Sequence, residues 1–167
     1  LGVWVSTDNR TWTRQEDDPL FTGFGPEEIA SFDGTVVIAG NAPNRGGNVA
    51  AVLTSQDLLS WTLTPLAGEA VAIDAWIFGL SSSDSRLFIT GQHNLNGVDW
   101  LPVVWSTADL SFWIESFMLP AAGGPNDQFG LPGTVYGVVE HGGRWVAVGE
   151  RVLPEGWDAT AWTSDNP

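Results

Sequence analysis

The apolar residues of this chain occur in short runs separated by turn-forming residues. Three runs share one form, in which a glycine near the end is followed by a polar residue: Thr35–Asn41, Arg86–Gln92 and Arg144–Glu150. Their β-branched and aromatic content is typical of strands. No apolar period of 3.6 residues extends far enough to predict a helix. The pattern therefore predicts an all-β chain.

A turn signal and a further strand precede each of these runs. The turns are predicted at Asp33–Gly34, Ser81–Ser85 and His141–Gly143. The strands before them are predicted at Glu28–Phe32, Ala72–Leu80 and Thr134–Glu140. Because Asp-Gly and Gly-Gly favour the positive φ of tight hairpin turns, each pair of strands should be an antiparallel hairpin.

A polar pattern, Ser/Thr–x–Asp–x–x–x–Trp, recurs at intervals of about 50 residues. Its copies are Ser6, Asp8 and Trp12; Ser55, Asp57 and Trp61; and Thr107, Asp109 and Trp113. Thr163 and Asp165 begin a broken fourth copy. Each copy lies between two more strand candidates, such as Leu101–Ser106 and Phe112–Phe117. One repeat thus contains four strands, which is the content of a β-propeller blade.

The sequence therefore predicts a β-propeller segment of four-stranded antiparallel blades, with about three and a half blades in an incomplete ring. Residues 1–15 would supply the outer strands of one blade, and residues 16–66 and 67–116 two full blades. Residues 117–167 would form a blade without its outer strand. The open edges would be completed by blades of a longer parent chain, which we favour, by a second chain, or by a partner that covers the open stack.

In its spacing, the polar pattern resembles the Asp-box (BNR-like) repeat of sialidase-like propeller proteins. It differs in having Arg10, Leu59 and Ser111 where that repeat usually has glycine, and in being one residue shorter before the Trp. The resemblance implies a structural role, in which the hydroxyl and the carboxylate hold a tight turn. The Trp would be buried between neighbouring blades. A catalytic role for these Asp residues is disfavoured, because their turns lie opposite the rim where propellers usually bind ligands.

Composition limits the partners that we expect. The net charge is −14, and the chain has six arginines and no lysine. Nucleic-acid binding is therefore excluded, because it depends on clustered basic residues. No apolar run is long enough for a membrane span, so no membrane insertion is expected. Cysteine is absent, and His93 and His141 should lie at opposite faces, so we predict no cofactor and no metal.

The candidate ligand rim comprises the connections between second and third strands and those between blades. Two of these connections pair an acidic residue with a tryptophan, Asp99–Trp100 and Trp157–Asp158. The tryptophans would stack on a sugar ring, while the carboxylates accept hydrogen bonds from hydroxyls. Arg45 lies in an equivalent connection. The alternative, to which we give more weight, is that both tryptophans simply cover the undersides of their loops.

Two functions follow. The first is a non-catalytic binding or scaffolding propeller segment that binds a glycan or a protein partner through this rim, in an extracellular or cell-surface protein. The second is a sialidase-like glycoside hydrolase whose active site is completed by blades outside this chain. Sialidases of this fold use three arginines, a Tyr–Glu nucleophile pair and an Asp acid/base. The resemblance directs attention to Tyr136 and to Arg14, Arg45 and Arg151, but no catalytic residue is assigned.

Overall fold

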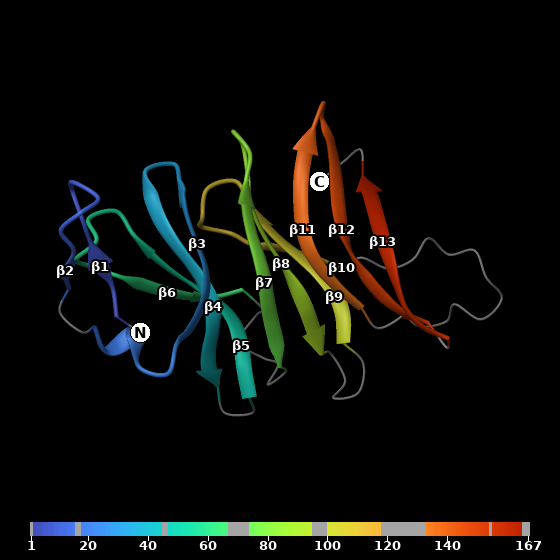
Figure 1. The fold of residues 1–167 in the computed structure, drawn as a ribbon, viewed down its shortest axis with the longest axis horizontal. Helices are drawn as coiled ribbons and strands as arrows, with labels where there is room; N and C mark the ends of the chain where they lie inside the picture. The colour runs from blue at the N-terminus through green and yellow to red at the C-terminus, as the bar shows by residue number, and fades with distance from the viewer. Residues whose placement is uncertain are drawn as a thin grey trace.

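The computed structural model describes residues 2–15, 18–44, 47–66, 74–94, 100–117, 133–153 and 155–164. These residues form strands β1–β13 and one 3-10 turn, η1 (Pro19–Phe21). The strands associate into four antiparallel sheets that stand side by side without closing a ring (Figure 1). The predicted all-β class is confirmed. Within the described ranges, no helix has the length and apolar character needed to cross a membrane.

The sheets are numbered 1 to 4 in chain order. Sheet 1 contains β1 (Trp4–Val5) and β2 (Thr13–Arg14). Sheet 2 contains β3 (Gly25–Phe32), β4 (Thr35–Asn44), β5 (Gly47–Ser55) and β6 (Thr62–Pro65). Sheet 3 contains β7 (Ala75–Ser82), β8 (Leu87–Asn94), β9 (Trp100–Thr107) and β10 (Ile114–Phe117). Sheet 4 contains β11 (Gly133–His141), β12 (Arg144–Leu153) and β13 (Gly156–Ser164).

In sheets 2 to 4 the strands pair in chain order, so β3, β7 and β11 occupy the same edge of their sheets. Strand β7 contacts both β3 and β11, and we call these three the inner strands. The sheets fan out from them toward β6, β10 and β13 (Figure 1). The limits of the repeats at residues 15, 66 and 116 stay a prediction, and the expected strand residues Ala72 and Ile73 lie outside the described residues.

The hairpin turns next to the inner strands have the predicted geometry. Asp33 and Gly34 have φ values of 47° and 71°, and Gly142 and Gly143 have 61° and 78°. Positive φ at both central residues matches the right-handed twist of the paired strands. The turn between β7 and β8 uses a side chain instead, because the N–H of Arg86 donates to the Ser83 hydroxyl at 3.1 Å.

Each inner strand contains a β-bulge opposite the repeated glycine. The bulged residues are Glu27, Phe78 and Tyr136. Each bulge brings an inner-strand carbonyl against that glycine: a Cβ at Gly91 would lie 2.0 Å from the carbonyl oxygen of Trp76. A Cβ at Gly40 or Gly149 would meet an equivalent carbonyl at 2.2 or 2.0 Å. No side chain fits there, which explains the glycine in all three repeats.

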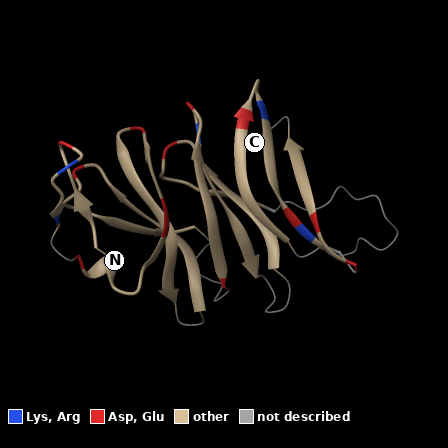
Figure 2. Ribbon diagram, viewed as in Figure 1, with Lys and Arg blue, Asp and Glu red and all other residues tan. Residues whose placement is uncertain are grey.

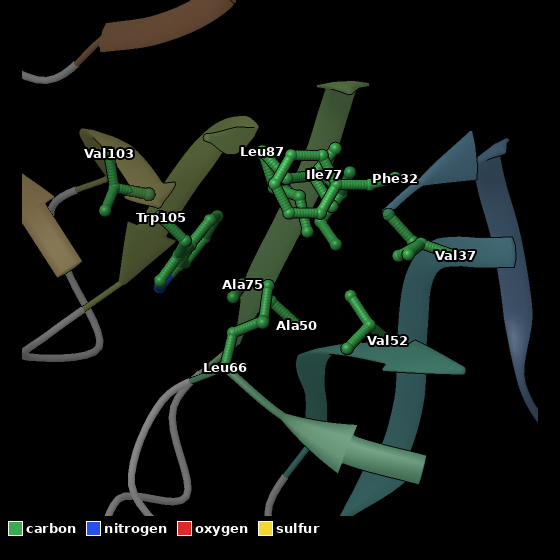
Figure 3. Close-up of a cluster of buried hydrophobic side chains, with 12 residues drawn as sticks. Phe32, Val37, Ala50, Val52, Leu66, Ala75, Ile77, Leu87, Val103 and Trp105 are labelled. Atoms are coloured by element: carbon green, nitrogen blue, oxygen red, sulfur yellow. The ribbon is translucent and has the colours of Figure 1, made fainter. Parts of the chain in front are cut away.

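The hydrophobic core consists of clusters between successive sheets. The cluster between sheets 2 and 3 joins residues such as Phe32 and Val52 to Ile77, Leu87 and Trp105 (Figure 3). A second cluster covers the other face of sheet 2, and a third lies between sheets 3 and 4. Burial of these apolar surfaces holds the sheets face to face. Acidic residues occur mostly at strand ends and turns, with few basic residues among them (Figure 2).

The polar pattern forms the turns between third and fourth strands. The Asp57 carboxylate accepts hydrogen bonds from the N–H groups of Leu59 and Ser60, both at 2.8 Å. Asp8 and Asp109 accept equivalent bonds from the backbone that follows them. In every copy the residue directly after the Asp has a positive φ of 58° to 64°. The left-handed position therefore comes one residue earlier than the glycine of an Asp-box, and glycine is not required two residues after the Asp.

The three motif tryptophans differ in burial. Trp61 is buried, and its ring packs edge to face on Phe21 with 5.6 Å between centroids, as predicted. Trp113 is partly buried against the cluster between sheets 2 and 3. Trp12 is 53% exposed, so the expected burial is wrong for this copy. The reason is that no described sheet precedes sheet 1.

Candidate functional site: the inner strands and the rim

The rim is the end of the sheets where second strands turn into third strands and inner strands begin. Its turns connect Asn44 to Gly47, Asn94 to Trp100 and Leu153 to Gly156. It lies at the bottom of Figure 1, opposite the turns that contain Asp8, Asp57 and Asp109. His93 is near the rim, whereas His141 adjoins the hairpin turn at the other end, as predicted.

Three exposed aromatic side chains project from neighbouring inner strands near the rim. Trp76 and Phe78 belong to β7 and are 40% and 39% exposed, and Tyr136 belongs to β11 and is 49% exposed. The rings of Phe78 and Tyr136 pack edge to face, with 5.9 Å between their centroids. We call these three residues the inner aromatic surface. Apolar rings of this size are usually buried, so their joint exposure makes this group a candidate contact surface.

Two of these rings occupy the same position in the repeat. Phe78 and Tyr136 are both bulged residues, opposite Gly91 and Gly149. Bulges are common next to binding sites. Both rings lie outside the inter-sheet core, whereas the adjacent Ile77 and Val135 are buried.

A carboxylate adjoins this surface. The Tyr136 hydroxyl donates a hydrogen bond of 2.6 Å to Oε1 of Glu150, on β12. This bond to Glu150, with burial and the negative charge of the carboxylate, raises the pKa of Tyr136. The tyrosine therefore keeps its proton at neutral pH. The pair offers a hydroxyl and a carboxylate side by side, the groups that bind the hydroxyls of a polar ligand.

The polar residue after each repeated glycine links its sheet to an inner strand. The Asn41 amide donates to the carbonyl of Ala75 at the start of β7. Gln92 accepts a hydrogen bond of 3.1 Å from the Thr134 hydroxyl at the start of β11. Glu150 is the third member of the series, and its recorded partner is Tyr136 of its own sheet. The first two links fix the relative positions of the inner strands.

Asp74 connects sheets 2 and 3 at the rim. Its carboxylate accepts a hydrogen bond of 2.9 Å from the N–H of Asn48, and its carbonyl accepts one of 2.9 Å from the N–H of Asn94. A Cβ at Gly47 would lie 2.0 Å from the same carboxylate, so glycine is needed for this approach. Asp74 therefore positions the two rim turns relative to β7.

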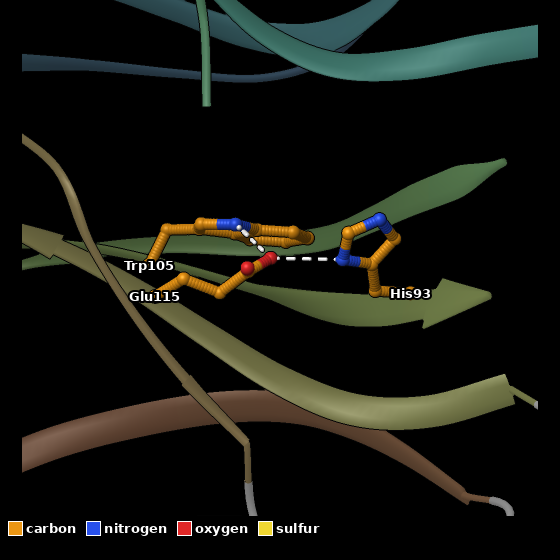
Figure 4. Close-up of polar contacts among 3 residues, drawn as sticks. All are labelled: His93, Trp105 and Glu115. Carbon is orange, nitrogen blue, oxygen red and sulfur yellow. Dashed lines mark hydrogen bonds and ion pairs between the residues drawn. The ribbon is translucent and has the colours of Figure 1, made fainter. Parts of the chain in front are cut away.

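A partly buried polar network crosses sheet 3 (Figure 4). One oxygen of Glu115 lies 2.8 Å from Nδ1 of His93 and accepts a hydrogen bond of 2.9 Å from the Trp105 indole. The three residues belong to β10, β8 and β9. Because the carboxylate is only partly exposed and is engaged by both neighbours, we assign it a role in fixing β10 to the sheet.

The predicted rim tryptophans occupy the same repeat position. Trp100 pairs with Asn94, and Trp157 pairs with Val152, each three residues beyond the repeated glycine of its sheet. Trp100 is partly buried and Trp157 is 66% exposed. The structure does not bring them into contact, and a stacking platform made by both stays a prediction.

The charged rim candidates are only partly described. Asp158 forms an exposed ion pair with Arg151, with 3.3 Å between Nη2 and Oδ2. Asp99 and Arg45 lie outside the described residues. Arg14, considered with Arg45 and Arg151 for a carboxylate-binding set, belongs to sheet 1, and sheets 2 and 3 separate it from Arg151 in sheet 4. Among the described residues, no group of three or more His, Asp or Glu side chains is placed to hold a metal ion.

Sequence reasoning did not single out Trp76, Phe78 or Glu150. The sequence does contain a signal for the two aromatic residues. Trp76 and Phe78 flank Ile77, and successive residues of a strand face opposite sides of the sheet. Alternation shows that these two rings share a face. It does not show whether another sheet covers that face.

No family model and no curated protein sequence matches the chain. Among solved structures, the chain aligns over 99% of its length with an α-L-arabinanase of Penicillium chrysogenum in complex with arabinobiose, at 18% identity and a TM-score of 0.56. A glycosyl hydrolase from Bacteroides ovatus matches 85% of the chain at 15% identity and a TM-score of 0.52. A β-1,2-mannobiose phosphorylase from Listeria innocua, in complex with β-1,2-mannobiose, matches 96% at 15% identity and a TM-score of 0.50.

The chain spans about half the length of these solved structures, covering 55%, 46% and 48% of them. At such low identity the likeness shows the fold alone. It defines the chain as a propeller-type all-β structure with an open ring. The resemblance to Asp-box repeats stays a prediction.

Proposed function

We propose that this chain is a carbohydrate-binding propeller segment and that the glycan binds at the inner aromatic surface. The joint exposure of Trp76, Phe78 and Tyr136 on two neighbouring inner strands supports this most strongly. Sugar rings have apolar C–H faces that pack on aromatic rings, and their hydroxyls bind carboxylates and hydroxyls. Glu150 supplies such a carboxylate next to Tyr136.

The comparisons give independent support for the ligand class. Two of the solved structures with this fold hold a disaccharide, arabinobiose in one and β-1,2-mannobiose in the other. Fold analogy alone is a weak argument for function, because one fold serves many activities. The proposal therefore depends on the side chains of this chain. Trp100, Trp157 and Asp158, with Asp99 and Arg45, would extend the glycan contact along the rim.

A glycoside hydrolase completed by further blades is the second candidate. The hydrogen bond between Tyr136 and Glu150 favours it, because sialidase-like propellers use a Tyr–Glu pair as nucleophile. The same contact with Glu150 raises the pKa of Tyr136, so the carboxylate would have to act as the general base that removes the phenolic proton. The pair alone therefore does not distinguish binding from catalysis, and the sialoside assay below does.

A glycan array tests the proposal. We expect the chain to bind a subset of arabino-, manno- or sialo-oligosaccharides, and Trp76→Ala to weaken that binding by about tenfold or more. Trp12→Ala is the matched control, because Trp12 is also exposed but lies directly before β2 of sheet 1, away from the inner aromatic surface. Equal loss in both variants, or no glycan bound by the parent chain, would contradict the proposal.

Two further sets of variants separate the alternatives. Trp100→Ala and Trp157→Ala should reduce glycan binding only if the rim extends the site. Unchanged glycan binding in both variants would exclude a stacking platform made by these two tryptophans. Turnover of a fluorogenic sialoside that is abolished by Arg45→Ala would establish the hydrolase instead.

A further inference from the structure

An apolar cavity lies between sheets 3 and 4, beside the outer strand of sheet 4. The cavity has a volume of about 130 Å³. Apolar side chains make up most of its lining: Phe88, Val104, Val138, Trp145, Ala147 and Trp162. Strand β13 is the last strand of this sheet among the described residues, so its outer edge carries no described partner. Sheets 2 and 3 each have a fourth strand at that edge.

The strand register aligns this cavity with the place that Trp61 fills in sheet 2. The repeated glycines pair with Ala51 in sheet 2 and Thr160 in sheet 4. Two residues before the repeated glycine, Ile38 pairs with Leu53 in sheet 2, and Ala147 pairs with Trp162 in sheet 4. The two pairs therefore occupy equivalent positions. Ile38 and Leu53 belong to the cluster in which Trp61 is buried.

The opposite wall of the cavity agrees with the same alignment. It includes Phe88 and Val104 of sheet 3, which correspond in register to Val37 and Val52 of sheet 2. Val37 and Val52 are part of the cluster against which Trp113 packs. Both walls of the cavity therefore match the surroundings of a motif tryptophan.

The other sheets also define where a fourth strand would pair with sheet 4. The fourth strands pair with residues 51–54 in sheet 2 and 103–106 in sheet 3. The equivalent stretch of β13 is Thr160–Thr163. In both complete sheets the tryptophan comes directly before the fourth strand, next to the pair that involves Thr54 in sheet 2 and Ser106 in sheet 3.

We infer that the cavity and the edge of β13 bind an antiparallel β-strand whose tryptophan fills the cavity. The occupant is the strand that completes the fourth repeat, which begins with Thr163 and Asp165 and would carry its tryptophan four residues after Asp165. Main-chain hydrogen bonds to Thr160–Thr163 would supply the pairing, and the indole ring would supply the apolar contact. This inference is independent of the proposed glycan site.

An extended chain tests the inference directly. The sequence of Phe112–Phe117 is added after Pro167, which places its tryptophan four residues after Asp165. We expect a rise of several degrees in the midpoint of thermal unfolding and slower amide exchange within Thr160–Thr163. The same extension with alanine in place of that tryptophan should give neither effect. An unchanged midpoint, or an equal rise with the alanine extension, would overturn the inference.

A fluorescein-labelled peptide with the sequence of Ser111–Phe117 tests the site in trans. Its binding to the unextended chain should fall by about tenfold or more when the peptide tryptophan is replaced by alanine. Ala147→Phe fills the cavity and should have the same effect, whereas Val148→Phe, at the exposed next position of β12, should not. A dimer of the unextended chain that is lost on Ala147→Phe would assign the cavity to a second copy and contradict the inferred occupant.

Discussion

At the scale of single residues, the surroundings of each motif tryptophan determine how much its side chain contributes to the stability of the fold. Trp61 lies among Phe21, Ile38 and Leu53, whereas Trp12 holds the same repeat position and remains exposed. The chemistry is identical in the two copies. Only the presence of neighbouring apolar groups differs, and burial of apolar area is the quantity that stabilises the fold.

We predict that Trp61→Ala lowers the free energy of unfolding by about 3–5 kcal/mol, because it removes a large buried ring and leaves a cavity. Trp12→Ala should lower it by less than about 1 kcal/mol, because an exposed side chain loses little contact. Urea denaturation measures both values. A loss below about 1 kcal/mol for Trp61→Ala would contradict the buried position of this ring.

Asp57 makes the stability of the turn between β5 and β6 depend on pH. Hydrogen bonds from the N–H groups of Ser60 and Leu59 lower the pKa of its carboxyl from 3.8 to about 2. Because the pKa is lower in the folded chain, the stabilisation is complete above pH 3.8 and is lost as the pH falls through about 2. Carbon-13 NMR of the carboxyl group should show the low pKa. Titration of Asp57 near 4, or unchanged acid stability in Asp57→Asn, would disagree with this account.

At the scale of the elements, the inner strands depend on a glycine opposite each bulge. The carbonyl of Trp76 occupies the place that a Cβ of Gly91 would take. Gly137, in β11, is not among the residues with positive φ, and no atom lies within 4 Å of such a Cβ. The two glycines therefore separate the cost of a steric clash from the general effect of a glycine in a strand.

We predict that Gly91→Ala destabilises the chain by more than about 2 kcal/mol, since two backbones must move apart to admit the methyl group. Gly137→Ala should be neutral or stabilising by up to about 1 kcal/mol, because the unfolded chain loses freedom. Thermal and urea unfolding compare the two variants. Similar effects in both would show that the close carbonyl does not constrain Gly91.

The order of the strands could be predicted from the sequence because its signals are local. Glycine followed by a polar residue, Asp-Gly turns and the Ser/Thr–Asp–Trp spacing each report on a few neighbouring residues. The positions of Trp76 and Tyr136 relative to one another could not be predicted in this way. They depend on bulges and on the packing of sheet 3 against sheet 4, which no local pattern encodes.

At the scale of the whole molecule, the inner strands and the outer turns have separate roles. The turns with Asp8, Asp57 and Asp109 use their polar groups within the backbone, which leaves them little capacity for a ligand. The three exposed rings of the inner aromatic surface lie on β7 and β11 instead, away from these turns. The central claim is therefore that glycan binding depends on the inner aromatic surface and not on tryptophan exposure in general.

The most direct test maps glycan contacts by NMR. The chain has ten tryptophans, so indole N–H signals can be followed individually after assignment by substitution. On titration with the oligosaccharide selected by the array, we predict that the Trp76 signal shifts while those of Trp12 and Trp61 do not. A shift at Trp12 with an unchanged Trp76 signal would contradict the account and place the ligand elsewhere.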